Sequence, residues 1–266
     1  MFKKILYNWF FLFFILLFVV PVMYLLIRSI TIGWRWESFD FISINIDGWT
    51  ELLGNYDINR AILTSVTISL VVILLNVIIS LPAAKELAFR DFKGKAFVDT
   101  ILQLPILFPS LAMVMGIHIT MIKLGLTDHW IGVSLVHLIP TVPYSIRIFR
   151  AAFEHLGPHL ELQAISLGAS KRRVFYHIYF PLLLPSVRSV IFLTTVISLS
   201  QYALTAIIGG GNVMTLAMIY FPYLSTVNEN LIASFSLLFG IIPFLVLLVI
   251  EILIQLLIPY RKSLFY

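Results

Sequence analysis

The chain has 266 residues, of which 60% are hydrophobic and only 12% are charged. Soluble domains are about 45–50% apolar and roughly 25% charged, so a mean hydropathy of +1.01 excludes a soluble enzyme, a disordered chain and a collagen-like fibre. The sequence contains no cysteine, which excludes disulfides, thiolate metal sites and cysteine nucleophiles. The pI near 9.4 fits a membrane protein whose basic residues set its orientation, and no nucleic-acid partner is expected.

Six apolar stretches, each long enough for a membrane helix of about 20 residues, follow one another along the chain. They cover about 8–30, 60–84, 97–122, 131–152, 182–208 and 232–258. The first begins after Lys3 and Lys4, like a secretory signal, but its apolar run is too long and no small-residue cleavage site follows, so we expect a retained anchor helix. Long runs without two-residue alternation predict helices and not a barrel.

The polar segments between these stretches predict the orientation in the membrane. All but four of the 18 Lys and Arg residues lie on the side that carries both chain ends. The four on the other side are Arg28, Arg35, Arg60 and Lys123, which stand among acidic residues that include Glu37, Asp40 and Glu229. Because basic loops stay in the cytoplasm, both termini are predicted to be cytoplasmic.

The connection at about 153–181 is the long cytoplasmic loop. Gly157-Pro158 ends the preceding helix, residues 160–167 have helical composition, and Gly168 separates them from a second helical stretch at 171–179. Pro181 suits the first turn of the next membrane helix. A helical hairpin of this kind predicts a docking element for another protein. The alternative is an amphipathic surface helix whose residues 171–173 lie among lipid headgroups.

The segment LQAISLGASKRRVFYHIYFP, residues 162–181, resembles the cytoplasmic EAA motif of permease subunits of bacterial ABC importers. Gly168, Ile178 and Pro181 have the spacing of that motif, and Ala164 matches its second Ala. Phe180 replaces the usual Leu. The Glu of the motif corresponds to Leu162, with Glu161 one residue early, and its first Ala corresponds to Gln163.

The resemblance extends over about 59–257 and implies the fold: an all-α integral membrane protein with six transmembrane helices and both termini cytoplasmic, of the type I importer permease (MetI-like) kind. It implies a transmembrane helix and outer loop over 1–58, the importer domain over 59–258, and a cytoplasmic tail over 259–266. The stretch 198–234 resembles subunits grouped with polyamine, thiamine, ferric-ion and phosphonate importers.

The resemblance also implies the partners. These are separate ATPase subunits, a second permease subunit (identical or related), an extracytoplasmic solute-binding protein and the lipid of a bacterial inner membrane. The residues implied to couple to the ATPase are Glu161, Ala164, Leu167, Gly168, Ala169, Ser170, Phe175, Ile178 and Pro181. Because the chain has no G-x-x-x-x-G-K-[ST] phosphate loop, it is expected to hold no nucleotide, no other cofactor and no catalytic site, with ATP bound by the partner subunits.

Polar residues at mid-span are candidates for lining a translocation path. They are Ser198, Gln201, Tyr202, Thr205, Asn76 and His118, with the densest group at 198–202. The alternative for each is a hydrogen bond between helices. Glu251 is an acid within the last apolar stretch, and we expect it to pair with Arg188 or Arg147, or to lie near the headgroups.

Three other functions compete with that of a transporter subunit. His155 and His159 resemble a zinc motif, but Gly157-Pro158 breaks the helix that would align them. Ser134 and His137 share a helix face, as in a hydrolase, but nothing supplies an oxyanion hole. An ion-coupled secondary transporter remains the alternative function, although it should carry charges at mid-membrane, and only Glu251 fits that expectation.

Overall fold

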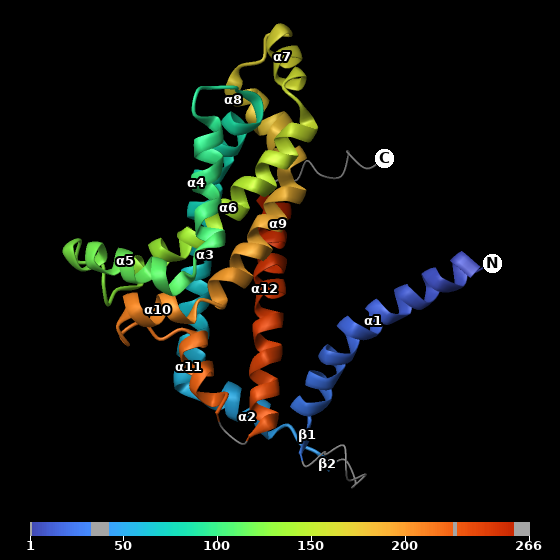
Figure 1. Ribbon diagram of the computed structural model, residues 1–266, viewed down its shortest axis with the longest axis vertical. Coiled ribbons are helices and arrows are strands. Elements are labelled where there is room, and N and C mark those ends of the chain that lie inside the picture. Colours follow the sequence, from blue (N-terminus) through green and yellow to red (C-terminus); the bar gives the residue numbers. More distant parts are fainter. Residues whose placement is uncertain (1, 33–42, 226–227, 258–266) are drawn as a thin grey trace. The chain divides into compact units, whose positions relative to one another are not determined.

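The computed structural model describes residues 2–32, 43–225 and 228–257. Within these ranges the regular elements are helices apart from one short antiparallel pair, β1 (Thr31–Ile32) with β2 (Ser43–Ile44), so the predicted all-α class is confirmed (Figure 1). Arg35, Glu37, Asp40 and the predicted tail 259–266 lie outside the described residues.

The chain divides into two compact units, and the first comprises residues 1–61 and 219–241. It contains α1 (Phe2–Ser29), the β1–β2 pair, α2 (Asp47–Gly54), the first turn of α3 (Tyr56–Phe89), most of α11 (Leu216–Tyr223) and the first half of α12 (Glu229–Leu257). Asn230 joins these elements: its Oδ1 accepts the Gly48 N–H at 2.6 Å and its Nδ2 donates to the Arg28 carbonyl at 3.1 Å. A Cβ at position 48 would collide with the Asn230 amide, so glycine is required there.

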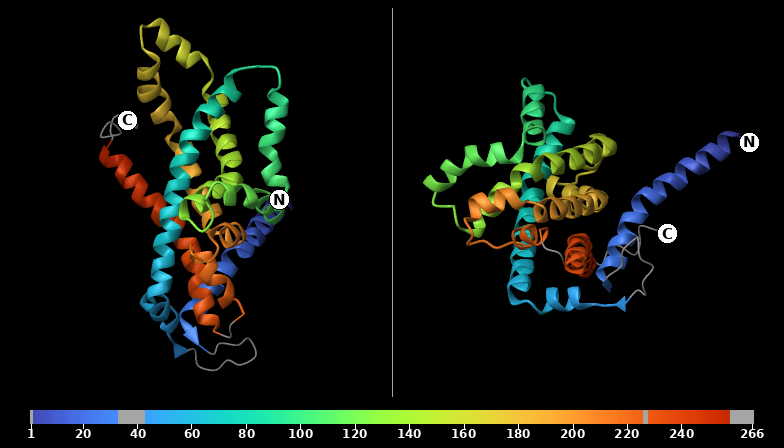
Figure 2. Two further views of the ribbon diagram at one scale, coloured as in Figure 1. Left: turned by 90° about the vertical axis from the view of Figure 1, so that its left-hand side faces the viewer. Right: turned by 60° about the horizontal axis from the view of Figure 1, so that its bottom comes forward.

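The second unit comprises residues 62–218 and 242–266 and contains the predicted hairpin. Besides the rest of α3 and α12, its elements are α4 (Lys95–Leu107), α5 (Ser110–Lys123), α6 (Trp130–Leu156), α7 (His159–Ser166), α8 (Lys171–Val174), the π-helical turn η1 (Phe175–Tyr179), α9 (Phe180–Leu199) and α10 (Tyr202–Gly209). Helix α6 packs along α9, and α10 packs against both α5 and α6. Both views of Figure 2 show α6 and α9 side by side, and the left view shows the α7 hairpin at their end.

Five helical segments in the described residues are long and apolar enough to cross a membrane, or six if one bent pair counts as a span. The five are α1 from Trp9, α3, α6, the continuous segment Lys171–Leu199, and α12. They coincide with five of the six predicted stretches, and the bent pair α4–α5 coincides with the remaining one.

The predicted third span, 97–122, is wrong as a single helix. Its two halves meet at an angle of 105°, with the break at Phe108–Pro109. Phe108 is extended, with φ −88° and ψ 142°, because the ring of a following proline disfavours helical backbone at the residue before it.

The predicted fifth span, 182–208, is also wrong in its last turns. Helix α9 ends at Leu199, Gln201 leaves the helical region with ψ 77°, and α10 begins at Tyr202. The side chains of Ser200 and Gln201 both donate to the Ile197 carbonyl. Such local side-chain hydrogen bonds compete with the backbone bonds that would continue the helix.

Candidate functional site

The predicted cytoplasmic hairpin is the candidate site. Helix α6 ends at Leu156, and the Gly157 that follows it has a positive φ of 72°. Two short helices, α7 and α8, come next and are joined around Gly168. They lie at the end of the second unit where α6 ends and the segment leading into α9 begins (Figure 1, Figure 2). The predicted helix–glycine–helix arrangement is therefore present.

Gly168 makes the turn of the hairpin. Its φ is 86°, its N–H donates to the Ile165 carbonyl at 2.9 Å, and the following Ala169 N–H donates to the Ala164 carbonyl at 3.0 Å. This pair of bonds is a Schellman motif, in which the residue after the helix end is left-handed and so favours glycine. Ser170 then starts α8 by accepting the Arg173 N–H with its hydroxyl.

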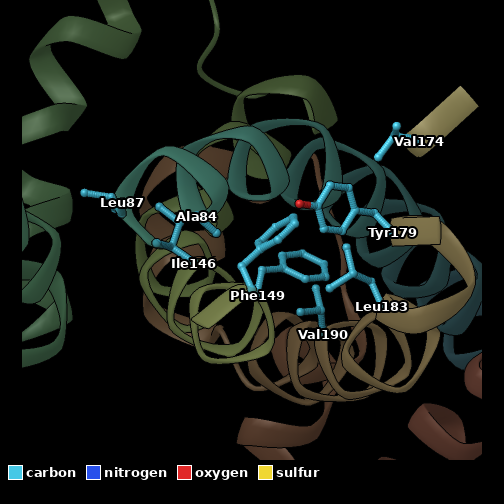
Figure 3. Close-up of a cluster of buried hydrophobic side chains, with 9 residues drawn as sticks. Ala84, Leu87, Ile146, Phe149, Val174, Tyr179, Leu183 and Val190 are labelled. Carbon is cyan, nitrogen blue, oxygen red and sulfur yellow. The ribbon is translucent and has the colours of Figure 1, made fainter. Parts of the chain in front are cut away.

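The inward side of the hairpin packs on a core shared by α3, α6 and α9. We call this the basal core; it consists of Ala84, Leu87, Ile146, Phe149, Phe153, Val174, Tyr179, Leu183 and Val190. Figure 3 shows Phe149, Tyr179, Leu183 and Val190 pointing toward one another at its centre. Four of the predicted coupling residues pack against it while remaining partly exposed: Ala164, Ala169, Phe175 and Ile178.

Glu161 also faces inward and makes the polar contact of α7. Its Oε2 lies 2.7 Å from the Lys85 ammonium of α3 and accepts a hydrogen bond from the Tyr179 hydroxyl at 3.1 Å. Burial disfavours its charged form, but the hydrogen bond and charge of Lys85 act in the other direction. With smaller effects from Tyr179 and the charge of Lys171, they hold the pKa of Glu161 below its ordinary value of 4.5.

The outward side of the hairpin is apolar and unusually exposed. Leu167, at the turn, has 89% of its surface exposed, and Leu162 and Ile165 of α7 have 58% and 40%. Lys171, Arg172 and Arg173 of α8 are also exposed. An exposed cluster of large apolar side chains marks an interaction surface. Leu167 meets this description among the predicted coupling residues, whereas Phe175 contacts the chain's own basal core.

Pro181 lies in the first turn of α9, as predicted. The sequence did not predict that α8, η1 and α9 form one helical segment from Lys171 to Leu199. Proline has no N–H for the regular helical bond, and the turn before it is widened: the Phe180 N–H donates to Phe175, five residues earlier. Such π-turns are frequent at functional sites.

The predicted path residues fall into a buried group, Ser198, Thr205 and Asn76, and a partly exposed group, Gln201, Tyr202 and His118. The buried group lies in one polar network around His137. The His137 Nδ1 is 2.9 Å from the Ser198 hydroxyl, and its Nε2 is 3.1 Å from the Thr205 hydroxyl. Because Thr205 donates its only hydroxyl proton to the Gln201 carbonyl, it must accept from Nε2–H, which leaves Nδ1 to accept from Ser198.

The network continues from His137 to Asn76. Thr141 donates to the His137 carbonyl at 2.7 Å and accepts from the Asn76 amide at 2.8 Å. These contacts connect α3, α6, α9 and α10. Ser198, Thr205 and Asn76 therefore make hydrogen bonds between helices. Gln201 bonds the Ile197 carbonyl, and His118 is partly exposed on α5; lining of a path by any of the six stays a prediction.

The predicted pairing of Glu251 with Arg188 is confirmed. The two side chains form a bidentate contact between α9 and α12, with Nε–Oε2 at 2.7 Å and Nη2–Oε1 at 3.0 Å. Two parallel charge-assisted bonds fix both side chains. The pair is therefore a tie between two membrane helices.

The zinc-like motif of His155 and His159 and the hydrolase-like pair Ser134 and His137 are not assembled. His155 is in α6 and His159 is in α7, on opposite sides of the Gly157 break. The Ser134 hydroxyl donates to the Trp130 carbonyl, and His137 binds Ser198 and Thr205 instead of Ser134. The Lys85–Glu161 contact was missed, although the acid beside the EAA-like segment was a signal that a basic partner could lie nearby.

Comparison with known proteins identifies the family. Residues 76–262 match the binding-protein-dependent transport system inner membrane component family, and the chain belongs to this family. It is 32% identical over 116 residues to the molybdate/tungstate transport system permease protein WtpB of Pyrococcus abyssi, covering 44% of this chain and 46% of that protein. It is 26% identical over 237 residues to the ferric transport system permease protein FbpB of Actinobacillus pleuropneumoniae, covering 77% and 34%.

A solved structure shows the same fold. The crystal structure of a bacterial ABC transporter involved in the import of the acidic polysaccharide alginate matches with a TM-score of 0.67 at 16% identity, over 98% of this chain and 96% of that one. The predicted importer-permease fold is thereby confirmed. The chain spans only about half the length of the curated relatives it matches first, with 46%, 56% and 34% covered.

Proposed function

We propose that this chain is a membrane-spanning permease subunit of an ATP-driven, binding-protein-dependent importer of a bacterial inner membrane. The observation that carries this proposal is the hairpin, whose inward side is fixed to the basal core while its outward side exposes Leu162, Ile165 and Leu167. Family membership over residues 76–262 supports the same function.

In this function the chain itself performs no ATP chemistry. Separate ATPase subunits bind and hydrolyse ATP, and the exposed apolar side chains of α7 bind in a groove of such a subunit, as a helix does in a hydrophobic groove. Movement of the ATPase subunits displaces the hairpin. The membrane helices then alternate between states open to either side of the membrane.

The remaining partners follow from the same proposal. A second permease subunit, identical or related, completes the translocation path, and an extracytoplasmic binding protein delivers the solute. The alginate transporter was crystallised in complex with a pentasaccharide-bound periplasmic protein, which supports a binding-protein partner of this general kind. Residues 59–258 would form the importer domain.

The ion-coupled alternative has little support. Its best candidate for a coupling site was Glu251, and that carboxylate is held in a bidentate contact by Arg188. A paired acid of this kind stabilises the contact between two helices and is a poor proton carrier, because taking up a proton would break its ion pair with the neighbouring guanidinium.

The docking step is tested by Leu167→Glu in the assembled importer. Placing a charge at this apolar contact should reduce co-purification of the ATPase subunit at least about tenfold, since losing a buried apolar anchor costs about 1.5–3 kcal/mol. The matched control is Leu124→Glu, because Leu124 is 62% exposed but lies in the α5–α6 connection, far along the chain from the hairpin. Undiminished ATPase binding by Leu167→Glu would contradict the proposed docking.

For the transported solute we propose a tetrahedral oxyanion. The support is that relatives bear the names of molybdate/tungstate and sulfate permeases, the latter CysW of Synechocystis at 24% identity. The test is uptake by the complete importer with its binding protein. Molybdate or sulfate uptake that ferric ion does not inhibit supports the proposal, and uptake of ferric ion alone contradicts it.

A further inference from the structure

In the part of the chain that the structure describes, one polar junction joins the hairpin to the membrane helices. We call it the α7 tie, and it consists of Lys85 of α3, Glu161 of α7 and Tyr179 of η1. The Glu161 carboxylate lies 2.7 Å from the Lys85 ammonium and 3.1 Å from the Tyr179 hydroxyl. The same ammonium lies over the Tyr179 ring, 4.9 Å from its centroid. Each member therefore contacts both others, so three elements meet at one point.

Tyr179 anchors this junction in the basal core. The residue is only 1% exposed, and its ring packs against those of Phe153 and Phe89 at centroid distances of 5.4 and 6.4 Å. Phe89 and Phe153 also pack edge to face at 5.7 Å. Because close-packed interiors are stiff, a force on Glu161 acts on α3 and α6 through a rigid ring.

The apolar contacts of α7 itself are small, because the larger apolar contacts of the hairpin, Val174 and Phe175, lie on its other arm. On α7 and the turn that follows it, the contacts are made by Ala164 and Ala169, whose side chains are single methyl groups. Such contacts resist the approach of two elements but hold them together only weakly, because little area is buried. An ion pair with a hydrogen bond attracts at contact and resists separation. The tie is thus the part of the attachment of α7 that can transmit a pull.

The neighbouring ion pairs do not connect α7. Arg90–Glu86 and Lys95–Asp91 each join residues four positions apart, and Arg150 joins Asp99 of α4 and Glu154 of its own helix. Within the ranges that the structure describes, Lys85–Glu161 is the ion pair that links α7 to a membrane helix.

We propose that Lys85, Glu161 and Tyr179 are positioning residues that make α7 and α3 move as one body when a partner displaces the hairpin. The inference rests on the proposed function, since it requires an ATPase subunit that moves α7. The acid that stands one residue before the Glu position of the EAA motif then has a role within this chain. Glu161 binds the hairpin to α3, and the exposed Leu162 and Leu167 contact the partner.

The test measures the distance between α7 and α3 in the complete importer. The chain has no native cysteine, so nitroxide labels are placed at His159→Cys on α7 and Leu74→Cys on α3, both exposed positions. Pulsed electron resonance then gives the distance distribution with and without ATP and vanadate. In the otherwise unchanged chain we expect one narrow distribution that is the same in both states.

Variants of the tie should separate the two helices. Lys85→Ala and Glu161→Gln are expected to add a second distance population on vanadate trapping, and Lys85→Arg to restore the single one. Arg90→Ala is the matched control, because its pair with Glu86 is at the same end of α3 but exposed; it should behave like the unchanged chain. In Lys85→Ala the number of ATP molecules consumed per solute transported should rise roughly fivefold or more. Fivefold is about the smallest change expected when the coupling between two sites is lost.

The inference is overturned if Lys85→Ala keeps the single distance population under vanadate, or if the distance in the unchanged chain already shifts. The charge exchange Lys85→Glu with Glu161→Lys guards against simple misfolding, since it should recover the single population at least in part. Failure of the proposed function has a different signature: no ATPase subunit co-purifies with the unchanged chain, whatever stands at position 85.

Discussion

At the scale of single residues, the direction of a side chain separates Glu161 from the acid of the EAA motif. The motif's Glu corresponds to Leu162, which is 58% exposed, whereas Glu161 points inward to Lys85. Successive residues of a helix are turned by about 100°, so a shift of one position moves the carboxylate from the outward to the inward side. The sequence showed the shift but not its consequence, because it does not reveal which side of α7 faces the core.

The lowered pKa of Glu161 predicts how its contact depends on pH. A carboxyl whose folded pKa lies below the ordinary 4.5 contributes stability above that pH, and the contribution is lost as pH falls through the folded pKa. The attachment of α7 should therefore be constant from neutral pH down to about 5 and weaken below 4.5 by about 1 kcal/mol, as for a partly exposed pair.

Hydrogen exchange of the α7 amides at a series of pH values, corrected for intrinsic rates, measures this dependence. Glu161→Gln should exchange faster at neutral pH and show no further loosening in acid. Equal acid sensitivity of the Gln variant would assign the effect to another group.

At the scale of elements, the sequence predicted the features that depend on single glycine, proline and ionisable residues: the hairpin turn, the start of α9 and the ion pair between α9 and α12. Gly157 and Gly168 both have positive φ and lie, as expected, at the start and at the turn of the hairpin. The cost of an unpaired acid in lipid predicted the Arg188–Glu251 contact. The breaks in α4–α5 and α9–α10 were missed. The sequence stays apolar through both breaks. Hydropathy alone therefore does not reveal the extended backbone of Phe108 or the side-chain hydrogen bonds of Ser200 and Gln201 that end the helices.

Gly168 provides a prediction about the hairpin turn. No atom lies within 4 Å of a Cβ built at this position, so Gly168→Ala is not opposed by a clash. It is opposed by the left-handed backbone, which costs a residue with a Cβ about 1–2 kcal/mol. Gly168→Asn should cost less, because Asn tolerates this conformation.

Limited proteolysis of the hairpin tests this order, with cleavage fastest for Ala, slower for Asn and slowest for the unchanged chain. Gly116→Ala is the matched control: it also has open space for a Cβ but lies inside α5 without positive φ, and it should not accelerate cleavage. Equal rates for Ala and Asn at position 168 would show that backbone conformation does not limit the turn.

At the scale of the whole molecule, the number of membrane crossings depends on the bent pair α4–α5, which counts either as one span or as none. The Lys85–Glu161 contact decides between these readings. It places the end of α3 and the beginning of α7 together, and α6 crosses the membrane between α4–α5 and α7. For the chain to cross through α6 and arrive beside the end of α3, it must first have crossed through α4–α5.

This reasoning predicts opposite accessibility on the two sides of the bent pair. Cysteines are placed singly at Lys93, between α3 and α4, and at Leu124, between α5 and α6; both positions are exposed, and the chain has no other cysteine. A membrane-impermeant maleimide should label Leu124→Cys in intact spheroplasts and Lys93→Cys only in inside-out vesicles, because Lys93 lies on the cytoplasmic side that the basic residues predict. Labelling of both from one side would make α4–α5 a re-entrant segment. In that case the hairpin, with its basic residues 171–173, and the end of α3 would lie on different sides of the membrane. The contact between Lys85 and Glu161 is incompatible with that arrangement.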